Sequence, residues 1–93
     1  MPYIHIAEFN QTTKGGTAVV LPPVVEQRFE LTQDNQVSEV FHDQTIIIRV
    51  KCDVACFIES GSDPEATDQS VPMAAGIEYF GILPGHRLAF IAA

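Results

Sequence analysis

The sequence predicts an all-β protein, a single small β-sandwich or jelly-roll-like domain of about seven or eight short strands. Three observations support this fold class. Apolar and polar residues alternate with a period of two in several short segments, and turn signals recur about every ten residues. No segment keeps a helical apolar period over about ten positions. The 93 residues allow one domain, 1–93, and the 46% hydrophobic content suits a packed core.

The N-terminal third predicts two strands and an edge segment. In residues 3–9, YIHIAEF, Ile4 and Ile6 share one face with Glu8 at its end, and the other face is also partly apolar. The run 17–23, TAVVLPP, ends in two prolines, which confine it to a sheet edge. Residues 24–32 alternate as a further strand. Because Gly and Pro interrupt residues 1–23, this region is also a candidate N-terminal arm that lies across a neighbour by strand addition.

The remainder of the chain continues the β pattern. Residues 37–52 predict two strands parted at 42–44, and the β-branched run 45–50 suits a central buried strand. Residues 54–60, VACFIES, follow closely and are expected to form its hairpin partner. The last strands are expected at 77–81 and 86–93, with a tight Pro84-Gly85 turn between them.

The charge balance argues against polyanionic partners. Twelve acidic residues against five basic ones give a net charge of −7, and the basic residues are scattered along the sequence: Lys14, Arg28, Arg49, Lys51 and Arg87. Nucleic-acid binding requires clustered cations, so neither nucleic acid nor an anionic membrane surface is an expected partner. The N-terminal residues lack the pattern of a secretory signal, and no apolar run approaches the roughly 20 residues of a membrane span.

The acidic segment within 53–70, DVACFIESGSDPEATDQS, is the first candidate for a metal site. Its acids are Glu59, Asp63, Glu65 and Asp68. They do not follow the order of a calcium-binding loop, and Pro64 interrupts them. A solvated loop that connects two strands is favoured over a weak cation site. The histidines His5, His42 and His86 lack a cupin-like H-x-H pattern, so no metal is expected, although a β fold can gather distant histidines.

Nucleophilic chemistry is equally unsupported. The serines Ser38, Ser60, Ser62 and Ser70 stand in no G-x-S-x-G elbow, and no glycine-rich phosphate loop occurs. Cys52 and Cys56 lack further zinc ligands and the C-x-x-C spacing, and are expected to be reduced, mostly buried thiols. A turn between them leaves open whether they meet. The sequence thus predicts no enzyme, catalytic residue, cofactor or small-molecule substrate.

Tyr79 and Phe80 are adjacent on a short strand, so their side chains are expected to point to opposite faces. One is expected in the core. The other is expected to be exposed or to contact a partner, because aromatic residues are enriched at interfaces.

The C-terminal half, residues 46–93, contains a series of short motifs. They begin at Arg49-Val50 and continue through C-F-I-x-x-G (56–61), D-P-x-A-T (63–67), A-G-x-E-Y-F-G (75–81) and Pro84-Gly85, with Pro72 and Leu88-Ala89. In these motifs this half resembles small tailed-phage virion proteins. These elements consist mostly of turn chemistry and strand alternation. Gly61 and Gly81 are expected at positive φ where strands end.

The resemblance implies a capsid decoration (cement) protein on the virion surface, made in the host cytoplasm. The implied partners are the major capsid protein and two further copies, in a homotrimer. Self-association would protect the unpaired strand edges of so small a domain. The alternatives are a head–tail connector, a tail or fibre component, or a stand-alone ligand-binding jelly roll.

Overall fold

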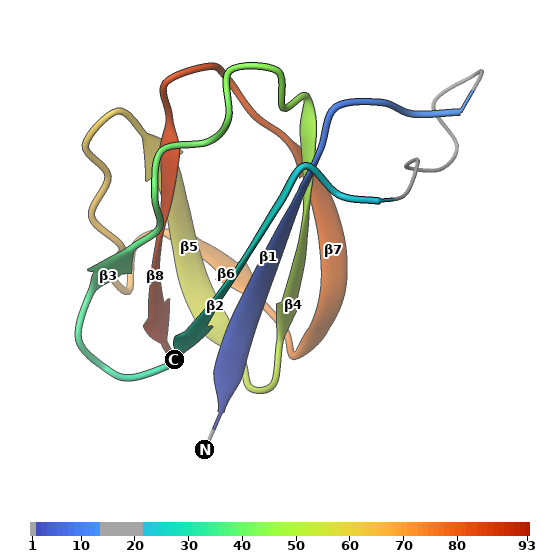
Figure 1. Ribbon diagram of the computed structural model, residues 1–93. Helices are drawn as coiled ribbons and strands as arrows, with labels where there is room; N and C mark the ends of the chain where they lie inside the picture. The colour runs from blue at the N-terminus through green and yellow to red at the C-terminus, as the bar shows by residue number, and fades with distance from the viewer. Residues whose placement is uncertain (1, 14–21) are drawn as a thin grey trace.

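The computed structural model describes residues 2–13 and 22–93, and within them the secondary structure is entirely β (Figure 1). The strands are β1 (Tyr3–Phe9), β2 (Val25–Glu30), β3 (Gln36–Val37), β4 (Ile47–Cys52), β5 (Cys56–Gly61), β6 (Val71–Met73), β7 (Gly76–Gly81) and β8 (Arg87–Ala92). They form two antiparallel four-stranded sheets, β2-β1-β4-β7 and β3-β8-β5-β6, packed face to face. The predicted all-β sandwich is confirmed.

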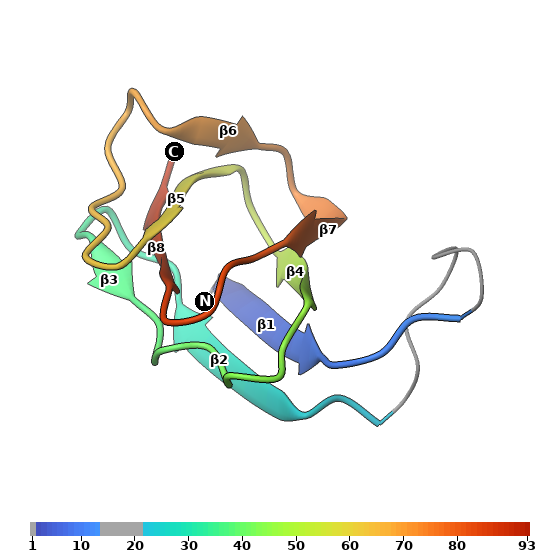
Figure 2. The same ribbon diagram turned by 90° about the horizontal axis from the view of Figure 1, so that it is seen from above.

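The strand order is jelly-roll-like. β3, β4 and β5 pair with β8, β7 and β6 in nested order, as in a long hairpin wrapped around itself. β1 then fills the position between β2 and β4. The two ends of the chain lie at the same end of the sandwich (Figure 1), and Figure 2 shows them apart across its width.

The core lies between the two sheets and follows the period-two pattern of the sequence. Side chains of β1 and β4 contribute from one sheet, and those of β5, β6 and β8 from the other. Phe90 is fully buried at the centre and meets the Phe29 ring at 5.2 Å between centroids. The buried apolar cluster comprises Ile4, Ile6, Leu31, Phe41, Ile48, Val50, Cys52, Cys56, Ile58, Met73, Leu88 and Phe90.

The predicted hairpin between residues 45–50 and 54–60 is wrong. β4 pairs with β1 and β7, while β5 pairs with β8 and β6, so the short connection 53–55 crosses from one sheet to the other. Both edges of β4 are already occupied. Asp53 holds the chain against β1 at the crossing, since its amide donates to the Tyr3 carbonyl at 3.0 Å and its carboxylate accepts from the Tyr3 amide at 2.9 Å.

Other local expectations also change. The strand predicted from residue 37 to 41 is only the two-residue β3, and the sequence pattern missed β6. Of the described glycines, Gly76 (φ 138°) and Gly85 (φ 79°) have positive φ, whereas Gly61 and Gly81 do not. Gly85 supports the predicted turn, because a type II turn with proline at its second position requires positive φ at the third.

The candidate N-terminal arm is restricted by the position of β1. Tyr3–Phe9 is an inner strand with partners on both sides, so it is part of the sandwich rather than a free segment. Deleting residues 1–16 would remove a central strand and could not test strand addition. The proposed edge segment at 17–23 falls largely outside the described residues, as does Lys14.

Candidate binding surface

Cationic side chains gather on the outer face of the sheet that contains β1. The register aligns Arg28, His5 and Lys51 in one row across β2, β1 and β4, and Arg49 stands two residues from Lys51 on the same face. We call this face, which carries Arg28, Arg49 and Lys51 with His5 between them, the cationic face. Arg28, Arg49 and Lys51 are scattered along the sequence, but strand pairing brings them onto one face, so the expectation that the basic residues do not cluster is wrong for these three.

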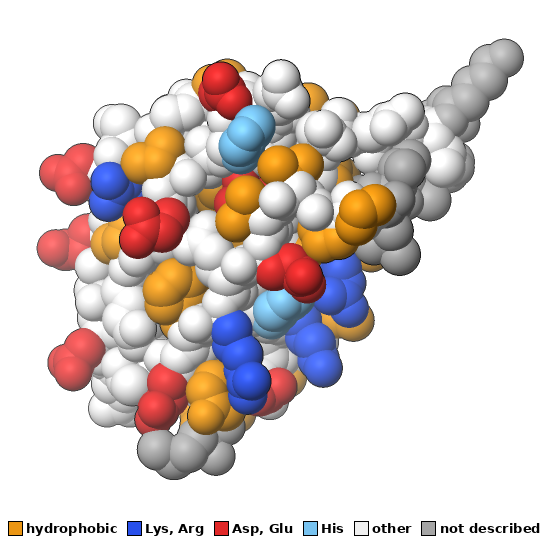
Figure 3. Space-filling model, in the orientation of Figure 1, with side chains coloured by type: hydrophobic (Ala, Val, Ile, Leu, Met, Phe, Trp, Pro, Cys, Tyr) orange, Lys and Arg blue, Asp and Glu red, His pale blue; other side chains and the backbone are white. Residues whose placement is uncertain are grey.

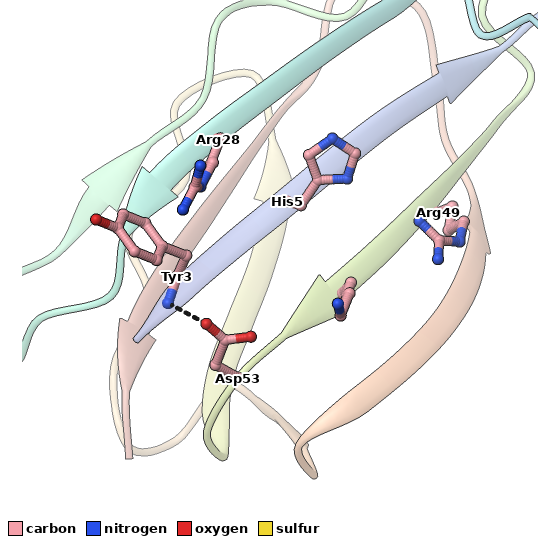
Figure 4. Close-up of a pocket in the computed structure, with 6 residues that line it drawn as sticks. Tyr3, His5, Arg28, Arg49 and Asp53 are labelled. Carbon is pink, nitrogen blue, oxygen red and sulfur yellow. Dashed lines mark hydrogen bonds between the residues drawn. The ribbon is translucent and has the colours of Figure 1, made fainter. Parts of the chain in front are cut away.

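The cationic face is an open depression of about 500 Å³, which Tyr3 and Asp53 complete at one end (Figure 4). The guanidinium of Arg28 lies 3.9 Å from the centroid of the Tyr3 ring, a cation–π contact that fixes its position. The His5 Nε2 atom lies 3.2 Å from the Glu26 carboxylate. The cations are spread along the face rather than aimed at one point, which suits an extended anionic partner.

Within the part of the chain that the structure describes, no carboxylate lies within ion-pair distance of Arg49 or Lys51. The two contacts of that length among these residues join a carboxylate to a histidine, in the pairs His5–Glu26 and His42–Asp43. Glu26, Glu30 and Asp53 lie on or beside the same face without reaching either cation. Arg49 and Lys51 are therefore available to a partner.

The edge strand β7 extends this surface with apolar side chains. Tyr79 is aligned with Arg49, and Ile77 with Lys51. Tyr79 is 50% exposed and Ile77 48% exposed, whereas Phe80 turns inward and packs against the core. The predicted opposite orientation of Tyr79 and Phe80 is confirmed.

One end of the sandwich exposes three large apolar side chains on its loops. Val40, Ile46 and Leu83 are 45%, 50% and 63% exposed, and we call them the apolar end. The loops that carry them are joined by a hydrogen bond from the Phe41 amide to the His86 carbonyl at 2.9 Å. Exposed apolar groups that gather at one end of a small domain are typical of a contact surface.

The loop of residues 38–46 is held in place by Glu8, a fully buried carboxylate. Its Oε1 atom accepts hydrogen bonds from the His42 amide at 2.7 Å and the Thr45 hydroxyl at 2.8 Å, and its Oε2 atom accepts one from the Gln27 side chain at 3.2 Å. Gln27 Oε1 in turn accepts from the Glu39 amide at 2.9 Å. The sequence pattern put Glu8 on the inner face of its strand but did not predict that it holds this loop. The available signal was a carboxylate at the end of an apolar face, because a buried charge requires partners.

The acidic segment connects β5 and β6, which pair in one sheet, so the prediction that it links two strands is confirmed. Along residues 63–66, exposed Asp63 and Glu65 alternate with buried Pro64 and Ala66. The Ala66 amide donates to the Asn35 side chain at 2.7 Å. We call residues 59–68 the acidic loop. Its carboxylates face solvent from an anchored segment.

We expect Asn35→Ala to loosen the acidic loop at a cost of about 1 kcal/mol, because the Ala66 amide loses its acceptor. Hydrogen exchange at Ala66 should accelerate about fivefold, while amides in β4 keep their protection. Ser62→Ala, at an exposed position of the same loop, serves as a control. Unchanged exchange at Ala66 would show that the bond to Asn35 does not anchor the loop.

Cys52 and Cys56 are free, buried thiols that meet in the core from opposite sheets. The Cys52 thiol donates to the Ala74 carbonyl at 3.4 Å. Burial, together with the adjacent Cys52 thiol and the Glu78 carboxylate, raises the pKa of Cys56 to about 12. Such a thiol is a poor nucleophile and a poor metal ligand at neutral pH.

The remaining candidate residues are distributed over the fold. His5 lies on the cationic face, and His42 and His86 lie in loops at the apolar end. In residues 2–13 and 22–93, no three His, Cys, Asp or Glu side chains are grouped to hold a metal ion. Buried Ser38 bonds to backbone groups and Ser70 to Glu59 and Thr67, so both have structural partners.

The acidic loop and the cationic face lie on different sides of the molecule. In Figure 3 most Lys and Arg side chains lie at the lower centre and right, over the sheet that contains β1, with a further one at the left. Acidic side chains line the left edge and also lie at the top, in the centre and beside the cations. Figure 1 places the segment that follows β5 at that left edge.

No family model matches the chain, no curated protein is similar to it, and no solved structure matches its fold. Among the described residues, no helix is long and apolar enough to cross a membrane. The surface chemistry of the chain is therefore the basis for a functional assignment.

Proposed function

We propose that this chain is a non-enzymatic bacteriophage virion structural protein that decorates the capsid. In this role it binds the major capsid protein on the outside of the shell and stabilises it as a homotrimer. The observation that carries the proposal is the apolar end, where Val40, Ile46 and Leu83 stand exposed on loops that are hydrogen-bonded to the body of the sandwich. A rigid end with exposed apolar groups suits docking onto another protein.

The buried polar groups support a structural role. Glu8, Ser38, Thr45 and Ser70 are buried, and no buried side-chain nitrogen or oxygen of the described residues lacks a hydrogen-bond partner. They hold loops and strands together. The depression on the cationic face is open and lined by side chains that project from strands. Such a shape suits contact with another macromolecule better than enclosure of a small substrate.

Co-sedimentation with empty heads, assembled from the major capsid protein encoded in the same genome, tests the assignment. We expect the wild type to bind. Ile46→Asp and Leu83→Asp should each weaken binding at least about tenfold, because burying such a side chain contributes roughly 1.5–3 kcal/mol. Val54→Asp is the matched control, since Val54 is 39% exposed in the turn at the other end of the sandwich.

Failure of the wild type to bind would contradict the proposal. Equal losses in the Val54 and Leu83 variants would contradict the assignment of the apolar end. A ring of many more than three copies in solution would instead favour the head–tail connector.

A further inference from the structure

The cationic face and the acidic loop match each other in spacing as well as in charge. Arg49 and Lys51 are two residues apart on β4 and project from the same face of the sheet. Asp63 and Glu65 are two residues apart in the acidic loop, and both are exposed while Pro64 and Ala66 are buried. Arg49 and Lys51, two residues apart in an extended strand, are roughly 6.5–7 Å apart. Two carboxylates with the same sequence spacing can therefore lie opposite these two cations.

The two surfaces cannot meet within one molecule. The acidic loop belongs to the sheet of β5 and β6 and is anchored beside β3 through Asn35. The cationic face is on the outer side of the other sheet, and the two views place these regions on different sides of the sandwich (Figures 1 and 2). A contact between them must join two copies of the chain.

We infer that the cationic face receives the acidic loop of a second copy of this chain, with Asp63 and Glu65 of one protomer opposite Arg49 and Lys51 of the next. The inference deepens the proposed function, since it assigns the contact that builds the oligomer. The contact joins two different surfaces, so each copy keeps one of each available. Repetition of such a contact either closes a ring or extends a chain, and a homotrimer requires closure.

A second copy fits this face better than a compact anion does. Arg28 and Lys51 lie on either side of the strand that carries His5, and neighbouring strands are about 4.8 Å apart, so the two cations are spread across the sheet. Tyr79 and Ile77, aligned with Arg49 and Lys51, add apolar area at the edge of the same surface. The acidic loop presents its carboxylates from a preformed segment, so little conformational entropy is lost on contact.

A charge-swap series measured by light scattering on size-exclusion chromatography tests the contact. The wild type is expected at three times the 10.2 kDa chain mass. The double variants Arg49→Glu/Lys51→Glu and Asp63→Lys/Glu65→Lys should each raise the dissociation constant by on the order of 100-fold or more, because they place like charges opposite each other. The quadruple variant reverses both surfaces, keeps the net charge of −7, and should restore the trimer.

Mixing the two double variants sharpens the test. One double variant carries two acidic surfaces and the other carries two cationic surfaces, so each can bind only the other. They can form alternating assemblies with even numbers of copies, and a mixed trimer cannot close. Glu39→Lys, a charge reversal in the loop of residues 38–46 and outside both surfaces, is the control and should stay trimeric. Circular dichroism checks that every variant is folded.

Three results would overturn the inference: a wild type that stays monomeric at all concentrations, double variants that stay trimeric, or a folded quadruple variant that stays monomeric. The proposed function is tested separately by co-sedimentation. A monomeric wild type that binds heads would overturn the inference and the homotrimer but would leave capsid binding supported. A trimer that responds to the charge swaps as expected but does not bind heads would overturn capsid binding and leave the inference supported.

Discussion

Replacing Glu8 with leucine is expected to lower the free energy of unfolding by about 4 kcal/mol, a large part of the stability of a 93-residue domain. The substitution leaves the His42 amide, the Thr45 hydroxyl and the Gln27 side chain without their shared acceptor. Each buried donor left unpaired costs roughly 1–3 kcal/mol. Urea unfolding followed by circular dichroism measures the loss.

In the Glu8 network each side chain is assigned as donor or acceptor, and a conservative substitution can test this assignment. In Glu8→Gln, one oxygen can still accept from His42 and Thr45, but the new amide faces the amide of Gln27. Gln27 cannot rotate without turning a donor toward the Glu39 amide. We expect this variant to lose about 2 kcal/mol.

The double variant Glu8→Gln/Gln27→Glu exchanges donor and acceptor across the contact. The side chain at position 27 can then accept from both position 8 and the Glu39 amide, so most of the lost stability should return. Gln27→Glu alone places two carboxylates together and should be less stable than the double variant. Purely additive effects of the two substitutions would contradict the hydrogen-bond scheme.

The Glu8 network also bears on the proposed binding surface. The loop that it holds carries Val40 and Ile46 of the apolar end. Glu8→Gln is therefore expected to weaken head binding, although Glu8 itself is fully buried and contacts no partner. Restored binding by the double variant would separate loop positioning from an unrelated loss of fold.

Stability is expected to fall steeply between about pH 9 and pH 12 because of Cys56. The folded state holds the pKa of this thiol at about 12, while the unfolded chain returns it to its ordinary value of 9.0. Within that window the folded state binds more protons than the unfolded state, so rising pH favours unfolding. One group contributes a slope of up to about 1.4 kcal/mol per pH unit. Below pH 9 the thiol is protonated in both states and this contribution is fully retained.

Cys56→Ala provides the control for the alkaline prediction. The variant is less stable at pH 7.5, because it loses the sulfur atom from the core. The difference from the wild type should shrink as pH rises through 9 to 10.5, since the variant lacks the titrating thiol. Urea midpoints at several pH values measure both curves. Parallel curves would show that the thiol does not titrate differently in the two states.

The local alternation of the sequence determined the fold class and most strand positions. Period two placed Ile4, Ile6 and Glu8 on one face of the first strand, and the structure buries all three. The Pro84-Gly85 turn and the opposite orientations of Tyr79 and Phe80 were also predictable. Each of these features depends on residues within a few positions of one another, where backbone geometry alone decides.

The pairing of strands depended on the tertiary structure. The short connection at 53–55 indicated a hairpin, yet β1 and β7 occupy both edges of β4, and the chain crosses to the other sheet. Because neither partner of β4 is near it in sequence, no local pattern could show this competition. The same limitation concealed that Cys52 and Cys56 meet across the core.

The candidate binding surface also depends partly on local sequence and partly on the tertiary structure. The sequence supplied the acidic loop and correctly assigned it to a connection between strands. It gave no sign of the cationic face, because Arg28, Arg49 and Lys51 come together only when β2 and β4 flank β1. Composition and spacing determine which side chains a strand presents, whereas long-range pairing determines which of them become neighbours, and binding depends on those neighbours.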